Sequence, residues 1–120
     1  MITCRPTRAE AEDYYRHCII DNADWSAVDA ILAKRKVTRQ SVGDEEYERR
    51  RRHQANGMGG LPIIGDPDAV AQELAKLSKA GLRGIGMSFV NYGKELPYFV
   101  AEVLPRLERM GLREPLKAVA

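Results

Sequence analysis

The residues with the most evident chemistry are four consecutive arginines and a histidine, at Arg49–His53. Arginine side chains form strong, charge-assisted hydrogen bonds with oxyanions, and a histidine such as His53 changes protonation state near neutral pH. Acidic side chains flank the run, and Tyr47 is the one aromatic residue beside it in the sequence. We therefore interpret the run first as the solvated face of a charged helix. A nucleic-acid-binding patch is the alternative that the arginines leave open.

Other common catalytic and binding motifs are missing from the sequence. There is no P-loop, no dinucleotide-binding glycine pattern, no serine–histidine–aspartate set and no paired-cysteine motif. The two cysteines, Cys4 and Cys18, are too few for a disulfide framework and lack the spacing of metal ligands. We expect both to be buried thiols, and we expect no metal site. We expect His17 to be an ordinary histidine within a helix.

The composition sets further bounds on the function. With 120 residues the chain is one domain at most, and it is shorter than a complete (β/α)8 barrel of about 250 residues. Its 19 basic and 17 acidic side chains give a net charge of +2, which provides no general attraction to nucleic acids or membranes. The sequence has no run of about 20 apolar residues and no signal-peptide pattern at its start. We expect a cytoplasmic protein without a membrane or nucleic-acid partner.

The chain is expected to open with a strand and two helices. Residues 1–6 alternate apolar and polar side chains, which is the period of a strand. Thr7 and Glu10 have the spacing of a capping box, which predicts a helix over 8–22. A second helix should end near residue 36, and its candidate N-caps are Asp24 and Ser26.

Residues 37–60 differ in character from the rest of the chain. Small and polar residues at 38–44 predict a loop, and the charged stretch 45–54 predicts a short helix at best. Glycines at 56–60 allow many backbone conformations. We interpret 37–60 as a mobile insertion between the two halves of the chain.

Regular structure is expected again from residue 61. The apolar stretch 61–65 predicts a short buried strand. Asp66 is a good N-cap and Pro67 suits the first position of a helix, where its missing N–H carries no penalty. Gly81 should end that helix as its C′ residue.

The last part of the chain completes an alternating pattern. Residues 84–89 are predicted to form a third, buried parallel strand, and a final helix should be kinked at Pro105 and end at Gly111. Alternating strands and helices predict an α/β fold with parallel strands. A three-stranded sheet leaves two open edges with unpaired backbone groups, which indicates part of a larger structure or an assembly.

The segment 61–111 resembles the C-terminal end of the luciferase-like, flavin-dependent monooxygenases, which include alkanesulfonate and dimethylsulfone monooxygenases. The N-terminal stretch 2–15 also resembles the family, in which a strand leads into a helix that begins with a similar threonine and glutamate pattern. The order and spacing of several short pieces carry the resemblance. These are Ile63-Ile64-Gly65-Asp66-Pro67, Val70-Ala71, Ala80-Gly81, Ser88-Phe89 and Val103-Leu104-Pro105-Arg106-Leu107.

The resemblance implies that the chain is the C-terminal portion of a (β/α)8 TIM barrel, as a single partial domain over 1–120. Residues 1–36 would supply the sixth strand and helices, 37–60 the insertion, and 61–113 the seventh and eighth strands with their helices. The family's first five strand–helix units have no counterpart in these 120 residues.

The resemblance also implies a reaction. The relatives use reduced FMN, supplied by a partner reductase, and O₂ to oxygenate a small organic substrate. We expect an organosulfur compound as one substrate class, and we expect a homo-oligomer. We also expect the 120 residues alone to be inactive, since most of the flavin phosphate site lies upstream in the family.

The resemblance suggests two groups of site residues. Relatives of the alkanesulfonate type carry an arginine on a mobile lid within the insertion, which makes Arg52, with the adjacent His53, the candidate catalytic pair. Active-site loops follow the strands of such barrels, so Ser88, Asn91 and Tyr92 after the eighth strand are candidates for binding the flavin. Packing at the barrel rim is the simpler interpretation of these three residues.

Two other classes of function remain open from the sequence. One is a non-catalytic module derived from a barrel end, which pairs its open strand edges with another subunit. The other is an RNA- or DNA-binding module that uses the run Arg49–Arg52 and binds in a strongly salt-dependent way.

Overall fold

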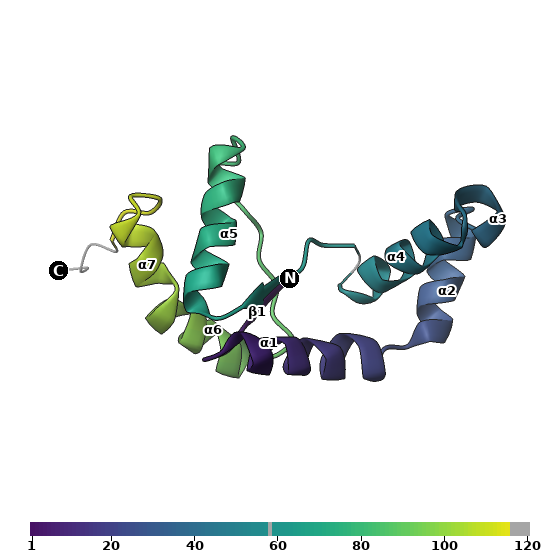
Figure 1. Cartoon of the computed structure of the whole chain (residues 1–120), viewed down its shortest axis with the longest axis horizontal. Helices are drawn as coiled ribbons and strands as arrows, with labels where there is room; N and C mark the ends of the chain where they lie inside the picture. Colours follow the sequence, from purple (N-terminus) through teal and green to yellow (C-terminus); the bar gives the residue numbers. More distant parts are fainter. Residues whose placement is uncertain (58, 116–120) are drawn as a thin grey trace.

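The computed structural model describes residues 1–57 and 59–115, and it is elongated rather than spherical. Its extents are 56 × 29 × 27 Å. Its radius of gyration is 16.6 Å, where a compact domain of this length has about 14 Å. Figure 1 shows two lobes joined by a long helical segment at the bottom of the view. Within the residues described, no helix combines the length and apolar character needed to cross a membrane.

The first lobe, which we call the sheet lobe, holds two strands and most of the apolar side chains. Its strands are β1 (Ile2–Cys4) and β2 (Ile63–Gly65). They pair in parallel, with Ile2 opposite Ile63 and Cys4 opposite Gly65. Parallel pairing between alternating helices confirms the predicted α/β class in its general form. The helices of this lobe are α1 (Arg8–Tyr15), α5 (Pro67–Lys79), α6 (Tyr92–Glu102) and α7 (Leu104–Arg109).

The second lobe, the helical lobe, is formed by three helices in the middle of the sequence. They are α2 (Trp25–Lys34), α3 (Arg39–Val42) and α4 (Asp44–Ala55). A π-helix, η1 (Arg16–Asp21), continues α1 and contacts α4. The predicted loop at 38–44 is therefore wrong, because Thr38 and Ser41 form a local capping box that supports one helical turn. Met58, in the predicted glycine-rich turn, lies outside the described residues.

The predicted third strand at 84–89 is wrong. This segment is extended but forms no ladder, and the one backbone bond recorded between it and a strand runs from the Ile2 N–H to the Ser88 carbonyl at 2.9 Å. Glycines at 84 and 86 contribute no side chain, and a Cβ added at either would meet no atom within 4 Å. Most of the segment is exposed, so no burial stabilises a regular strand there.

The position of this segment sets the order of the sheet. The Met1 carbonyl and the Arg5 N–H bond to β2, whereas the Ile2 N–H bonds to Ser88. Successive residues of a strand direct their backbone groups to opposite sides, so β1 lies in the middle, between β2 and the segment 84–89. The chain thus passes from β1 to β2 on one side, and then crosses to the segment 84–89 on the other side of β1.

The apolar core lies on one face of the strands. Ile2, Cys4 and Ile63 point to this face and pack against α5, α6 and α7. Gly65 is required there, because a Cβ on it would lie 2.9 Å from the Cβ of Ala69. The other buried members of the core are Val70, Ala71, Leu74, Phe89, Phe99 and Val103. In Figure 1 the strands lie between α5 above and α1 below.

Local signals at the helix ends are confirmed where the sequence predicted them. Thr7 and Glu10 form the capping box of α1, and Asp66 accepts a hydrogen bond from the Ala69 N–H before the proline that starts α5. Gly81 has φ +99° and ends α5. The predicted kink at Pro105 is present as the break between α6 and α7.

Candidate functional site

The strongest candidate site lies at the carboxyl ends of β1 and the segment 84–89. In open parallel sheets, ligands bind outside the carboxyl ends of strands at the point where the strand order reverses. The described sheet has two strands, and the segment 84–89 adjoins β1 through one backbone bond, so the corresponding position here lies between β1 and this segment. Arg5 directly follows β1, and Asn91 and Glu95 follow the segment, so all three arrive at this point. We call Arg5, Tyr14, Asn91 and Glu95 the carboxyl-edge cluster.

Buried contacts fix the geometry of this cluster. One Nη of Arg5 lies 2.9 Å from Glu95 Oε1, and the other donates to the Cys4 carbonyl at 2.9 Å. The guanidinium stacks 3.7 Å from the centre of the Tyr14 ring. The Glu95 side chain is only 5% exposed, and its second oxygen accepts the Asn91 N–H at 2.5 Å. Glu95 therefore holds both the arginine and the start of α6.

A pocket of about 320 Å³ opens beside the cluster, lined by Arg5, Pro6, Lys94, Glu95 and Tyr98. The Asn91 side chain caps α6 by accepting the Lys94 N–H at 3.2 Å, which places Lys94 at the pocket. Two cations and one carboxylate line the space. Because Glu95 is already engaged by Arg5 and Asn91, the pocket suits a small polar or anionic group.

The Cys4 thiol and the Tyr14 hydroxyl near the cluster are neutral at pH 7. Burial raises the pKa of the Cys4 thiol to about 11, so Cys4 is not a nucleophile at neutral pH. Burial, together with a hydrogen bond to Cys18, raises the pKa of the Tyr14 hydroxyl, which stays protonated. The prediction of a buried thiol is confirmed for Cys4, whereas Cys18 is half-buried.

The predicted flavin-binding residues Ser88, Asn91 and Tyr92 lie at this edge, but only Asn91 belongs to the carboxyl-edge cluster. The Ser88 backbone carbonyl accepts a hydrogen bond from the Ile2 N–H of β1, and the residue is exposed. Tyr92 is 53% exposed and packs edge-on against Phe89, with ring centres 5.5 Å apart.

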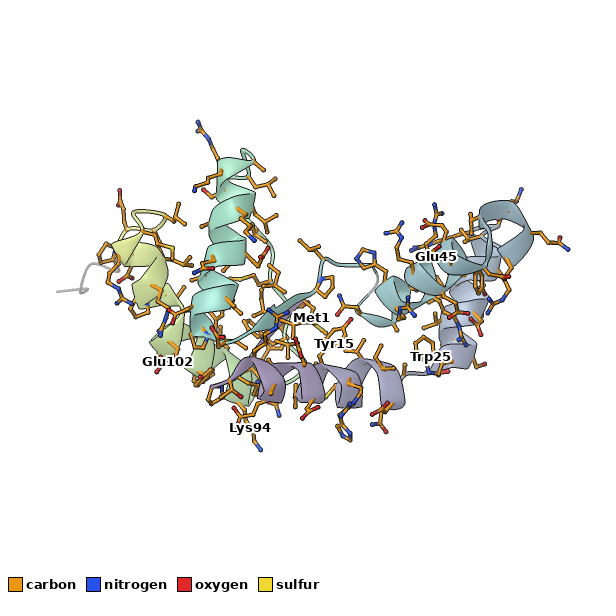
Figure 2. The ribbon with its side chains drawn as sticks, in the orientation of Figure 1. Met1, Tyr15, Trp25, Glu45, Lys94 and Glu102 are labelled. Carbon is orange, nitrogen blue, oxygen red and sulfur yellow. The ribbon has the colours of Figure 1, made fainter. Side chains whose placement is uncertain are left out.

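The predicted catalytic pair, Arg52 and His53, lies elsewhere. Both residues are in the last turn of α4, and neither lines the pocket at Arg5 and Lys94. Figure 2 shows α4, whose start is marked by Glu45, in the other lobe from Lys94 at the start of α6. Arg52 is exposed beside Tyr15, whose pKa burial raises and the Arg52 charge partly lowers. The structure thus does not bring Arg52 and His53 to the carboxyl-edge cluster.

The other arginines of the run bind carboxylates. Glu46 accepts hydrogen bonds from Arg49 and Arg50, at distances of 2.6 to 2.7 Å, and these bonds lower its pKa to about 2. Arg51 donates two bonds to Asp29, at 2.7 and 2.9 Å. These contacts match the interpretation of the run as a charged, mostly solvated helix face.

Sequence reasoning missed Arg5, Tyr14 and Glu95. Arg5 follows a strand directly, which is a recognisable position for a site residue in an α/β fold. Glu95 stands four residues after the N-cap Asn91, within reach of its backbone N–H. No local pattern links Arg5 to Glu95 across 90 positions, so their pairing needs the fold.

No group of metal-binding side chains is present among residues 1–57 and 59–115. No family model, curated protein or solved structure matches the chain. The luciferase-like resemblance therefore depends on its sequence motifs alone.

Proposed function

We propose that the chain is the C-terminal part of an FMN-dependent monooxygenase of the luciferase-like type, built as a portion of a (β/α)8 barrel. It would oxygenate a small organic substrate with O₂ and reduced FMN from a partner reductase, and organosulfur compounds are the first class to test. The carboxyl-edge cluster is the observation that carries the proposal. It lies at the strand ends where barrel enzymes bind their ligands, beside residues 88–92.

The barrel requires one rearrangement of the segment 84–89. Consecutive barrel strands are neighbours, so the segment would pair with the free edge of β2 rather than with β1. One described backbone hydrogen bond attaches it to β1, and such a bond contributes about 0.5–1.5 kcal/mol net. The exchange would also move Phe89 out of its place in the core and shift Glu95 relative to Arg5, so further strands would have to compensate for these contacts.

The cluster by itself does not form a complete flavin site. Arg5 and Lys94 would hold an anionic group, but the pocket of about 320 Å³ lies at the small end of the range for ligand sites. Its lining, which includes Arg5, Lys94 and Glu95, offers no broad apolar slot for a three-ring flavin. We expect the 120 residues alone not to oxygenate a substrate.

The test is flavin content and activity of the native assembly. The protein is isolated from its own cells under mild conditions, and its flavin is measured after denaturation. Oxygen incorporation is then assayed with a flavin reductase and a series of small organosulfur compounds. We expect bound FMN and substrate-dependent turnover, both lost in Arg5→Ala and kept in Arg8→Ala, an exposed arginine on α1. A flavin-free assembly that takes up no added FMN contradicts the proposal.

A second candidate, a module that pairs with another copy of itself, is favoured by the open edge of β2. Ile63 and Gly65 direct their backbone groups to β1, so the Ile64 N–H and carbonyl point to the open side. A groove of about 340 Å³ runs along this edge between Arg8 and Glu12 of α1 and Glu73 of α5. Antiparallel pairing of two such edges about a two-fold axis would satisfy both Ile64 groups.

The exposed area supports the same candidate. The chain exposes 8114 Å², whereas a compact monomer of its mass exposes about 6,500 Å². The difference, about 1,600 Å² for one chain, is about twice the area of roughly 800 Å² that each partner buries in a standard interface.

Sedimentation at increasing protein concentration tests this second candidate. We expect a dimer that Leu61→Lys dissociates, because Leu61 lies in the groove at the β2 edge and is 55% exposed. Leu82→Lys is the matched control, since Leu82 is 50% exposed but lies outside that groove. A monomer at every concentration, or equal dissociation by both variants, would exclude pairing through β2.

A further inference from the structure

An apolar groove of about 540 Å³ lies in the sheet lobe, between α5, the segment 82–87 and the helices α6 and α7. We call it the α5–α6 groove. Core residues, among them Leu74 and Phe99, form its base. Its other apolar lining includes six large side chains that are each 37–50% exposed, namely Leu82, Ile85, Met87, Leu96, Val100 and Leu112. Exposed apolar side chains that gather in one groove indicate a surface that another molecule covers.

The walls of the α5–α6 groove are rows of side chains on helices. Along α6 and α7 the row has steps of four, four and three residues and consists of Leu96, Val100, Leu104 and Leu107. On α5 the row is Leu74 and Ser78. In Figure 1, α5 and α7 lie side by side, and they are in contact. Ridges of side chains on any helix have this spacing of three and four residues, so a further helix can pack between the two rows.

The segment 82–87 leaves room for close approach on the third side. Gly84 lines the groove, and a Cβ added there would meet no atom within 4 Å. A small molecule is a poorer occupant than a protein segment. Pockets for small molecules enclose most of their ligand, whereas here the large apolar side chains of the lining are more than a third exposed.

The charged residues of the groove are all cationic. Among the residues described, Arg83 and Arg113 line it and no carboxylate does. Arg83 is exposed and takes part in no ion pair between described residues. Arg113 lies 3.9 Å from Glu108, a distance at which an ion pair is weak. The groove is therefore complementary to a partner that carries carboxylates beside its apolar side chains.

A second copy of the chain is a poorer occupant of this groove. A two-fold contact places the same surface of both copies face to face, so the two arginines would meet their own counterparts. The exposed area also allows a partner in addition to pairing at β2. The excess of about 1,600 Å² is enough for the share of one chain in two standard interfaces.

We propose that the α5–α6 groove binds an acidic amphipathic helix of a partner protein. The apolar stripe of that helix lies along Leu96 and Val100, and its flanking carboxylates meet Arg83 and Arg113. The row from residue 96 to residue 107 is about 16 Å long, which corresponds to about three turns of the partner helix. The proposal is independent of the oxygenase chemistry, because no residue of the carboxyl-edge cluster lines the groove.

Two designed peptides of about 15 residues test the proposal, because such short peptides are only marginally helical on their own. Both carry leucines at steps of three and four, with glutamate and alanine elsewhere in one peptide and lysine and alanine in the other. Binding to the full chain is measured by fluorescence anisotropy, and helicity by circular dichroism. We expect the glutamate peptide to bind about tenfold more tightly than the lysine peptide and to become more helical when bound. Equal affinities, no saturable binding of the glutamate peptide up to about 1 mM, or binding without a gain in helicity would overturn the proposal.

Variants of the chain locate the binding surface. Val100→Gln should weaken binding of the glutamate peptide about tenfold, because it removes an apolar contact within the groove. Met110→Gln is the matched control and should change the affinity by less than about twofold, since Met110 is 45% exposed but does not line the groove. Equal losses in these two variants would contradict the assigned surface.

Arg83→Gln tests the part played by charge. It should weaken binding of the glutamate peptide by about threefold and leave binding of the lysine peptide unchanged or stronger. Equal weakening of both peptides would refute the charge complementarity. Sedimentation of Val100→Gln tests the alternative occupant. A smaller oligomer than that of the unmodified chain, together with no bound peptide, would assign the groove to a second copy and refute the proposal.

Discussion

The two lobes of the molecule are stabilised by different kinds of contact. The sheet lobe packs large apolar side chains that are almost fully buried, including Ile2, Val70, Phe99 and Val103. In the helical lobe, the buried apolar residues within α2 and α4 are Val28 and Leu32, and many described contacts are ionic. Apolar burial is insensitive to salt, whereas exposed ion pairs are screened by it. The sheet lobe therefore has a conventional apolar core, whereas the stability of the helical lobe depends on the salt concentration.

Cation–π contacts reinforce the ion pairs of the helical lobe. The Arg51 guanidinium stacks 4.5 Å from the Trp25 ring while it binds Asp29, and Arg39 lies 4.6 Å from the Tyr47 ring while it pairs with Glu48. Each such contact contributes little to stability at an exposed site, so the stability of the helical lobe depends on several of them together. A region of this kind is expected to open locally while the rest of the protein stays folded.

The largest effect should come from the sheet lobe. Phe99→Ala removes a side chain that is 1% exposed and packs edge-on against Phe89, with ring centres 5.5 Å apart. We expect the free energy of unfolding to fall by about 3–5 kcal/mol, measured by urea denaturation. Val100→Ala, at a residue 44% exposed on the same helix, should change it by less than about 0.5 kcal/mol. Similar losses at both positions would show that the sheet lobe has no ordered core.

The next effect concerns the partly buried ion pair between Arg5, which follows β1, and Glu95 of α6. Arg5→Met leaves the buried Glu95 carboxylate without its cation, and we expect a loss of about 2 kcal/mol in the free energy of unfolding. The residual exposure of Arg5 keeps the effect below that of a fully buried pair. Glu95→Gln in the Arg5→Met background should recover part of the loss. A double variant less stable than Arg5→Met alone would contradict this account.

A smaller and more local effect is expected in the helical lobe. Arg51→Met removes the contacts to Asp29 and to the Trp25 ring, and should cost about 1 kcal/mol. Hydrogen exchange should accelerate in α2 and α4 and stay unchanged in β1 and β2. Acceleration across both lobes would mean that they unfold as one unit, which would break the comparison.

The smallest of the expected effects is the loss of stability of the helical lobe in acid. Arg51 lowers the pKa of Asp29 from 3.8, and Arg49 and Arg50 lower that of Glu46 from 4.5 to about 2. A lowered pKa means that these pairs stabilise the fold fully above pH 4.5 and lose their effect as the pH falls toward 2. Trp25, the one tryptophan, reports on this lobe by fluorescence. Its signal should change over that range, with a shallower change in Glu46→Gln, and a constant signal down to pH 2 would contradict the prediction.

Features set by neighbours in the sequence were predictable. The caps at Thr7 and Asp66, the helix end at Gly81 and the break at Pro105 all depend on residues within one turn of each other. Such interactions do not require knowledge of the rest of the fold. The parallel pairing of β1 and β2 also followed from the alternation of strands and helices.

Features set by distant contacts were not predictable. The stretch 84–89 has the composition of a strand, but a strand forms only where a neighbour offers a ladder and burial. Here no ladder forms, and every residue except Phe89 is exposed. The loop predicted at 38–44 failed for another reason, since Ser41 replaces the usual glutamate in its capping box. Asn91 was predicted to bind the flavin because it follows the expected eighth strand, and the structure places it in the carboxyl-edge cluster. Its partners Arg5 and Glu95 are brought together only by the fold.

The parallel register of β1 with β2 has a consequence for synthesis of the chain. Ile2 is made some sixty residues before its partner Ile63, with the whole helical lobe between them. At a translation rate of about 5–20 residues per second, β1 waits about 3 to 12 s for β2. During that interval the Ile2 and Cys4 side chains lack the strand beside which they are buried. Folding of the sheet lobe therefore requires β1 to stay protected until β2 has been made.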